Sequence, residues 1–174
     1  MSVQLASSRL VLAPFTFADI SLRYVAWLND PEVVRYSNQR FRRQDVQSCE
    51  AYLCSFDGGP NQFWSIRLAA DGRMIGTMTA YLAPQHGTAD IGLLIGERSV
   101  WGQGYGYEAW QLLMGHLLGK QVLRKITAGT ASCNVGMIKI IERSGMQLEA
   151  TRRQQEIIDG ELQDVVYFAK FGTA

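Results

Sequence analysis

A glycine-rich stretch just past the middle of the chain constrains the fold more than any other feature of the sequence. Residues 99–110 read Ser-Val-Trp-Gly-Gln-Gly-Tyr-Gly-Tyr-Glu-Ala-Trp. Its glycines are Gly102, Gly104 and Gly106. A mostly apolar run, 90–96, precedes it and an apolar segment, 110–118, follows it, which predicts a strand, a loop and a helix. Glycine has no Cβ, and the N–H groups that open a helix lack partners within it and favour an anion. We therefore predict a loop that binds a phosphate or diphosphate.

Two common phosphate-binding motifs do not fit this spacing. The phosphate loop of NTPases ends in Gly-Lys-Ser/Thr, which is absent here. The dinucleotide-binding fingerprint has its third glycine one residue later and usually lies near the start of a βαβ fold. This stretch is Gly-x-Gly-x-Gly and lies past the middle of the chain. The glycines alone also fit a structural turn, so a further match is needed.

That further match is a family resemblance. The segment 101–109 is similar to the acyl-CoA pyrophosphate loop of the GCN5-related N-acetyltransferase (GNAT) superfamily, most of all in the branch of the ribosomal-protein N-terminal acetyltransferases. The Arg or Gln that usually opens this loop is Trp101, a variant common in that branch. Downstream, Asn134 to Met137 and then 144–146 resemble the family's Asn-x-x-Ser/Ala…Gly-Phe segment with its spacing intact. The resemblance extends over nearly the whole chain.

Composition limits the classes of protein that fit. A chain of 174 residues with 47% hydrophobic and 19% charged residues predicts a single domain, 1–174, which the resemblance makes an acyl-CoA N-acetyltransferase domain. A net charge of +1 gives no long-range attraction to nucleic acid or to an anionic membrane. No apolar run reaches the roughly 18 residues of a membrane helix, and the N-terminus does not resemble a signal peptide. The odd, unpatterned cysteines fit a reducing cytoplasm, and no metal site is predicted.

Local patterns predict an α/β fold. Strands are expected at 5–13, 63–69, 74–82, 90–95, 125–130, 146–158 and 162–171. Helices are expected after Thr16, over 46–56, over 110–118 and from Asn134 to Gly145. Several hairpins among these strands predict a mixed, largely antiparallel central sheet of about seven strands with helices on both faces. The GNAT resemblance implies that this sheet is splayed between its fourth and fifth strands, where the arm of acyl-CoA lies.

The resemblance also implies a site for acetyl-CoA as co-substrate. The glycine loop suits the diphosphate, and the amides of the pantetheine arm can pair with strand backbone like an added strand. The implied contacts are Leu94, Ile95, Gly96, Trp101, Gly102, Gln103, Gly104, Tyr105, Gly106 and Asn134. Asn134 has an alternative role as a simple helix cap, which needs no ligand.

Direct acyl transfer to an amine needs a neutral amine, a stabilised oxyanion and a protonated leaving thiolate. A backbone N–H from 94–96 could polarise the carbonyl, and the family's proton-donating Tyr is Ile141 here, which leaves water as the donor. The resemblance implies a base in the last hairpin, where this branch tends to place an acidic residue near the acceptor amine, and Glu156 is the predicted base there. Alternation puts Glu156 on one strand face with Ile158. Its alternative role is a solvated charge beside Arg152 and Arg153.

Other candidates are weaker. Asp90 is a second candidate base, and Glu108 fits a support for the helix start better than a base. Cys133, beside Asn134, has no His or Asp at motif spacing to activate it as a nucleophile. The basic stretch 40–43 fits a solvated helix start, or a contact to an acidic acceptor or to the CoA 3′-phosphate.

We therefore predict transfer of the acetyl group from acetyl-CoA to a primary amine. A protein α-amino group, with a pKa of about 8 against about 10.4 for lysine, suits a site with few acid–base groups. An amino-sugar nucleotide, a polyamine or an antibiotic amine would also fit. A non-catalytic acyl-CoA-binding module stays open, as does a methyltransferase that rests on the glycines alone. No nucleic-acid or membrane partner is expected, and a homodimer is left open.

Overall fold

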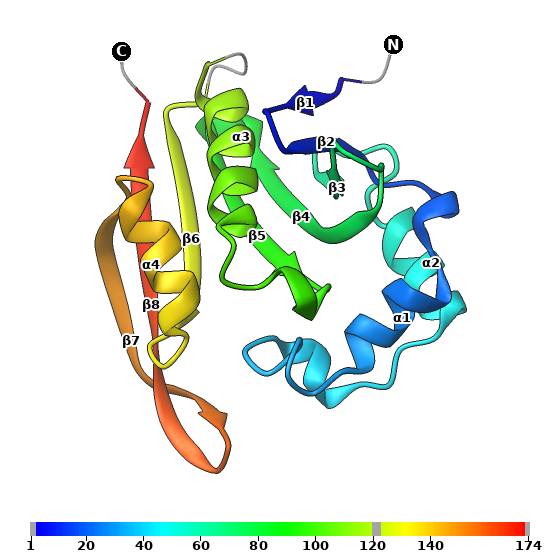
Figure 1. Ribbon diagram of the computed structural model, residues 1–174. Helices are drawn as coiled ribbons and strands as arrows, with labels where there is room; N and C mark the ends of the chain where they lie inside the picture. Colours follow the sequence, from blue (N-terminus) through cyan, green and yellow to red (C-terminus); the bar gives the residue numbers. More distant parts are fainter. Residues whose placement is uncertain (1–2, 120–122, 173–174) are drawn as a thin grey trace.

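The computed structural model describes residues 3–119 and 123–172, which form one mixed sheet with helices packed against it (Figure 1). The described strands are β1 (Leu5–Ala6), β2 (Leu10–Pro14), β3 (Gln62–Leu68), β4 (Met74–Ala83), β5 (Thr88–Ile95), β6 (Lys125–Ala131), β7 (Gln147–Ile158) and β8 (Glu161–Phe171). The described α-helices are α1 (Leu22–Asn29), α2 (Val46–Cys54), α3 (Tyr105–Gly119) and α4 (Val135–Arg143). The strand order is β1-β2-β3-β4-β5-β6-β8-β7, and among these strands only β5 and β6 pair in parallel. The predicted fold class is confirmed.

Two details differ from the prediction. The described part of the sheet has eight strands, because the predicted first strand is divided by a turn in which the Ser7 N–H donates to the Leu10 carbonyl at 2.9 Å. The first long helix begins at Leu22, capped by Ser21, rather than after Thr16. The capping box at Thr16 starts only a single 3₁₀ turn, Phe17–Asp19, because Ile20 leaves the helical conformation with ψ of 77°.

Helices cover both faces of the sheet because its strands alternate apolar side chains between two cores. In β3, Trp64 points into a core shared with α3 and α4, whereas Phe63 points into a core shared with α1 and α2. In β5, Leu93 packs against the first core and Leu94 against the second. Within the described residues, no helix is long and apolar enough to cross a membrane.

The sheet opens between β5 and β6. These strands share three bridges, the last of which joins Asp90 to Thr127, and they then diverge (Figure 1). The remaining half of β5, up to Ile95, therefore has a partner on its β4 side and an open edge on its β6 side. This is the splay that the resemblance implies between the fourth and fifth predicted strands.

Candidate active site

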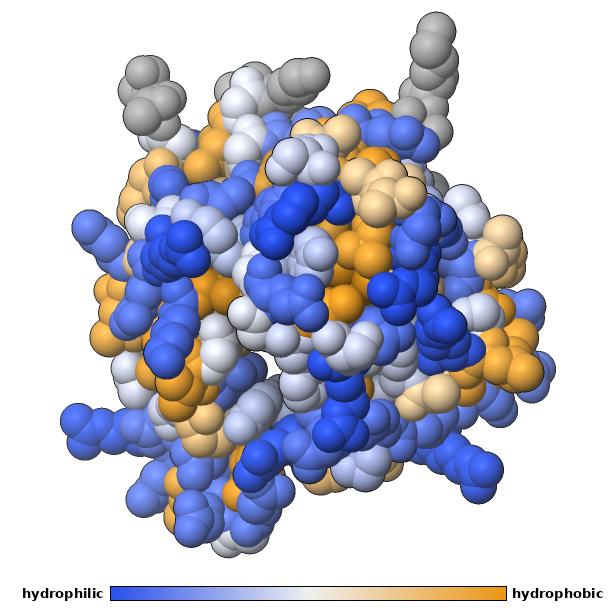
Figure 2. Space-filling view, in the orientation of Figure 1, coloured by the Kyte–Doolittle hydropathy of each residue, from blue (hydrophilic) through white to orange (hydrophobic). Residues whose placement is uncertain are grey.

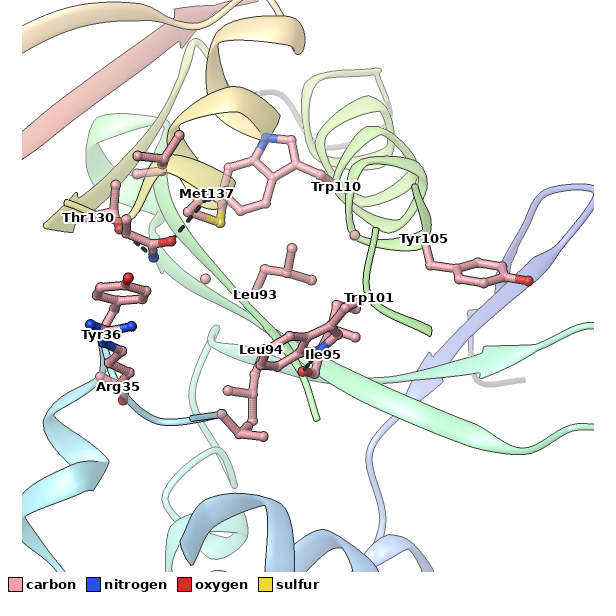
Figure 3. A pocket seen from close by; sticks show the side chains of 18 of the residues that line it. Arg35, Tyr36, Leu93, Leu94, Ile95, Trp101, Tyr105, Trp110, Thr130 and Met137 are labelled. Atoms are coloured by element: carbon pink, nitrogen blue, oxygen red, sulfur yellow. Dashed lines mark hydrogen bonds between the residues drawn. The ribbon is translucent and has the colours of Figure 1, made fainter. Parts of the chain in front are cut away.

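A cavity of about 670 Å³ lies in the splay between β5 and β6. Its walls come from the open half of β5, the glycine loop before α3, the end of β6 with the start of α4, and residues 32–37. Figure 2 shows the molecule hollowed in this region, and Figure 3 shows side chains from these elements around one space. Three parts of the chain that are far apart in the sequence, 32–37, 91–110 and 128–137, thus converge on a single cavity.

The glycine loop presents unpaired backbone donors to this cavity. Gly102 and Gly104 have φ of +76° and +83°, a region that favours glycine. The N–H groups of Trp101 and Gln103 donate back to carbonyls in the loop, and that of Glu108 donates to the Gly104 carbonyl at 3.1 Å. In the ranges 3–119 and 123–172, no acceptor faces the N–H groups from Gly104 to Tyr107. These donors open α3, where the helix dipole also favours an anion.

Two residues of the β1–β2 turn hold the loop in place. Arg9 donates to the Gln103 carbonyl at 3.0 Å and to the Glu108 carboxylate at 2.7 Å, and Ser7 Oγ donates to Glu108 at 2.5 Å. Partial burial opposes ionisation of Glu108, but these hydrogen bonds outweigh it and lower the pKa of its carboxyl. Glu108 thus supports the start of α3, as predicted. Its partners in the β1–β2 turn could not be identified from local pattern.

The open edge of β5 offers backbone groups to the same cavity. The Gly96 N–H donates to the Ile75 carbonyl of β4 at 3.0 Å, which sets the alternation of the ladder. The peptide groups of Leu94 therefore face β4, and those of Leu93 and Ile95 face the gap. The Ile95 carbonyl accepts from Trp101 Nε1 at 2.8 Å, in agreement with this direction. Leu93, which also lines the cavity, was missed by the sequence prediction.

Most of the predicted acyl-CoA contacts line this cavity, and two do not. The lining residues include Leu94, Ile95, Trp101, Gly102, Gly104, Tyr105, Gly106 and Asn134. Gly96 packs closely against the Trp27 ring instead, with no room for a Cβ between them. Gln103 lines a groove on the outer side of the loop. At Gly106 a Cβ would meet Ile140 at 3.1 Å, so this glycine also serves the packing of α3 against α4.

Asn134 caps α4 and still has a donor to spare. Its Oδ1 accepts from the Met137 N–H at 3.2 Å, and its Nδ2 donates to Thr130 Oγ1 at 3.1 Å. An amide nitrogen carries two hydrogens, and only one has an acceptor among the described residues. Asn134 lines the cavity, so the second hydrogen is available to a ligand.

Ile141, at the family's usual Tyr position, does not line the cavity, whereas Tyr36 does. Ile141 is fully buried in the core under α4. Tyr36, from the segment after α1, lines the cavity, and Figure 3 shows its hydroxyl directed toward Thr130. No described residue hydrogen-bonds the Tyr36 hydroxyl. No local pattern in the sequence marks Tyr36 as a site residue.

Glu156 lies outside the lining of the cavity, on the β7–β8 hairpin beside it. It shares the inward face of β7 with the buried Ile158, as alternation predicts. Instead of purely apolar neighbours it has Arg40, whose Nη2 lies 3.5 Å from its carboxylate. Arg40 also donates to the Ile157 carbonyl at 3.2 Å, and Arg35 donates to Asp159 at 2.6 and 2.9 Å. The role of Glu156 as a base stays a prediction.

The weaker candidates occupy defined positions. Cys133 lines the cavity, but no histidine of the described chain lines it with Cys133, so nothing there activates the thiol. Asp90 accepts from Thr127 Oγ1 at 2.8 Å, at the last bridge between β5 and β6, and does not line the cavity. Among the described residues, no group of three or more His, Cys, Asp or Glu side chains is placed to hold a metal ion.

Comparisons with known proteins agree with this geometry. The family model for the acetyltransferase (GNAT) domain matches residues 9–147. An uncharacterized N-acetyltransferase, p20 of Bacillus licheniformis, is 30% identical over 171 residues, which cover 95% of this chain and 94% of that protein. Similar solved folds include the ribosomal L7/L12 α-N-protein acetyltransferase RimL in complex with coenzyme A, at a TM-score of 0.83, 18% identity and coverage of 97% and 98% of the two chains.

The spermidine N-acetyltransferase of Vibrio cholerae in complex with CoA and spermine has the same TM-score of 0.83, with 18% identity and coverage of 95% and 97%. At such identities the two structures support the fold alone, and their acceptors differ from each other. The match over residues 9–147 and the 30% identical relative carry the family assignment. The chain belongs to the GNAT family of acetyltransferases.

Proposed function

We propose that this protein transfers the acetyl group of acetyl-CoA to a primary amine, and that this amine is a protein N-terminal α-amino group. The observation that carries the proposal is the combination, in one cavity, of unpaired N–H groups at the start of α3 with the open edge of β5. A diphosphate followed by an arm with two amides fits these two features in that order.

Particular residues would hold the co-substrate. The N–H groups from Gly104 onward would bind the diphosphate, with Gly102 and Trp101 beside them. Backbone of Leu93 and Ile95 would pair with the amides of the arm, and the free Nδ2 hydrogen of Asn134 would donate to it. An N–H of Leu93 or Ile95 is also the group best directed to polarise the acetyl carbonyl. The peptide groups of Leu94 face β4, so Leu94 would lie between these two residues in β5 without pairing with the arm itself.

The reaction requires two proton movements. It joins the amine nitrogen to the acetyl carbon and breaks the bond to sulfur, so the amine loses a proton and the sulfur gains one. We propose Tyr36 as the donor to sulfur, because its hydroxyl reaches the cavity and has no partner among the described residues. Glu156 is proposed to take the proton from the amine, directly or through water, once the amine displaces Arg40.

The choice of a protein α-amino group rests on its acidity. With a pKa of about 8 it is neutral near pH 7 far more often than a lysine amine at about 10.4. RimL, a protein of similar fold, bears the name of such an enzyme. A cytoplasmic location, where the free cysteines Cys49, Cys54 and Cys133 stay reduced, is part of the proposal.

The test is a screen of amines with detection of free thiol from acetyl-CoA. The panel should hold N-terminal peptides, spermidine, an amino sugar and an amino-sugar nucleotide. Amine-dependent thiol release, with an acetylated product of the expected mass, would support the proposal. Acetyl-CoA binding by calorimetry without thiol release from any amine would instead indicate a non-catalytic acyl-CoA-binding module. Release with small amines but no peptide would retain the transferase and refute the peptide acceptor.

A further inference from the structure

A second cavity, of about 580 Å³, lies on the other face of β5, beneath α1 and α2. Gly92, Leu93, Leu94 and Ser37 line both cavities, so the two meet along the open half of β5. One of these shared residues, Leu93, is also one whose backbone would hold the acyl arm. A molecule in the second cavity can therefore present an amine to the first.

The charged residues of the described chain that line the second cavity are all positively charged. No aspartate or glutamate of the described chain lines it, and its charged lining residues are Arg42 and Arg43. Asp45, the next carboxylate along the chain, is engaged at the α2 N-terminus, where it accepts from the Ser48 N–H at 2.8 Å. Burial raises the pKa of Tyr24 and Tyr52 well above their usual range, so both line the cavity as neutral phenols.

The two guanidinium groups have no anionic partner of their own. Arg40, on the same segment, is paired with Glu156 and with the Ile157 carbonyl. Within residues 3–119 and 123–172, neither Arg42 nor Arg43 side chain makes a hydrogen bond or ion pair. Both are exposed at the edge of the cavity, where their charge is available to a ligand.

The interior of this cavity is suited to an uncharged part of a ligand. Thr77 and Thr79 of β4 contribute hydroxyls, and Leu28 and Phe63 contribute apolar surface. Because Gly92 has no Cβ, the space beside Thr79 stays open. A Cβ at this position would lie 2.8 Å from Thr79 Oγ1 and would fill it. A ligand would thus meet positive charge at the rim and neutral groups near β5.

We propose that this second cavity holds the acceptor, and that Arg42 and Arg43 bind a carboxylate or phosphate that the acceptor carries besides its amine. The proposal rests on the proposed function and narrows its substrate class. An N-terminal peptide with an acidic side chain in its first residues satisfies it, and so does a phosphorylated amino sugar. A polyamine does not, because it brings only positive charge to two unpaired guanidinium groups.

The experiment compares probes that differ only in the anion. One pair is a tetrapeptide amide with aspartate or asparagine at its second position, and the other is glucosamine 6-phosphate with glucosamine. The ratio kcat/KM for acetyl transfer is measured by thiol release, with spermidine as a further probe. We expect kcat/KM to be about tenfold higher for the acidic member of at least one pair. This factor corresponds to the lower end of the range for a hydrogen bond to a charged group. The pair that shows the preference identifies the source of the anion.

Matched variants assign the preference to the arginines. Arg42→Gln and Arg43→Gln should each move the ratio between acidic and neutral probes toward one, through KM. Arg153→Gln is the control, since Arg153 is also exposed and lines no cavity described above. Because none of these side chains makes a contact that holds the fold, melting temperatures should agree. An unchanged ratio in both arginine variants, no preference in either pair, or a preference for spermidine would overturn the proposal.

Failure of the proposed function gives a different result. If no probe releases thiol, the transferase assignment is wrong, and the inference is then decided by calorimetric binding of the same probes to the protein with CoA present. Tighter binding of the acidic probes that is lost in Arg42→Gln or Arg43→Gln would support it. Equal binding of acidic and neutral probes would refute it.

Discussion

Asn134 allows the cap and the ligand contact to be separated by two substitutions. In the structure its Oδ1 caps α4 by accepting from the Met137 N–H at 3.2 Å, while its Nδ2 has one hydrogen free. Asn134→Ala removes both functions. Asn134→Asp keeps an oxygen for the cap and removes the amide hydrogens, because a carboxylate only accepts.

The two variants should differ in stability. Loss of an N-cap costs about 1 kcal/mol, and for 150–250 residues each kcal/mol lowers Tm by about 2–4 °C. Asn134→Ala should therefore melt about 2–4 °C lower. Aspartate caps as well as asparagine does, and its charge is favourable at a helix N-terminus, so Asn134→Asp should melt close to the parent.

The two variants should agree in their effect on acetyl-CoA. A lost hydrogen bond of about 0.5–1.5 kcal/mol weakens binding by roughly three- to tenfold. Both should raise the dissociation constant for acetyl-CoA by at least this factor, measured by calorimetry on folded protein. If Asn134→Ala melts lower while both variants bind acetyl-CoA as tightly as the parent, Asn134 is a cap only and the proposed contact is wrong.

Three further substitutions test other parts of the site. Gly104→Ala places an L-residue at φ of +83° among the proposed diphosphate donors and should raise KM for acetyl-CoA, whereas Gly58→Ala, at φ of +70° in open space, should cost similar stability without changing KM. Tyr36→Phe should lower kcat by about a hundredfold, at the low end for a lost proton donor, in single-turnover assays; an unchanged kcat would leave water as the donor. Glu156→Gln should lower the rate by about 10²–10⁴ near neutral pH, with the deficit shrinking as pH rises and the amine deprotonates unaided. Equal rates at all pH values would reduce Glu156 to an ion-pair partner of Arg40.

The strand, loop and helix around Gly104 were predictable because their signals are local. Apolar period, glycine spacing and a helix start all lie within residues 90–118, and the structure has β5, the loop and α3 there. The cap at Asn134 was predictable for the same reason. The splay of the sheet came from the family resemblance, and the strand order was not predicted, because strand pairing joins residues that local pattern does not relate.

The remaining site residues could not be found from sequence because each owes its role to a distant partner. Arg9 lies in the turn between β1 and β2 and holds Glu108, 99 residues away. Tyr36 enters the cavity only because the segment after α1 passes below the end of β5. Leu93 was missed in favour of Gly96 because the choice depends on the phase of the β4–β5 ladder, which a shift of one residue inverts.

The β7–β8 hairpin illustrates which features strand alternation can predict and which it cannot. Period two correctly places Glu156 with Ile158 on the inward face, and Ile158 is buried beside Val34. What that face meets is decided by the segment 35–40, more than 110 residues earlier, which brings Arg35 to Asp159 and Arg40 to Glu156. The Arg35–Asp159 pair is exposed to solvent and contributes little to stability. The Arg40–Glu156 pair differs, because the Arg40 side chain is only 15% exposed and its Nη2 lies 3.5 Å from the Glu156 carboxylate. An incoming amine must therefore displace a largely buried guanidinium before Glu156 can accept its proton.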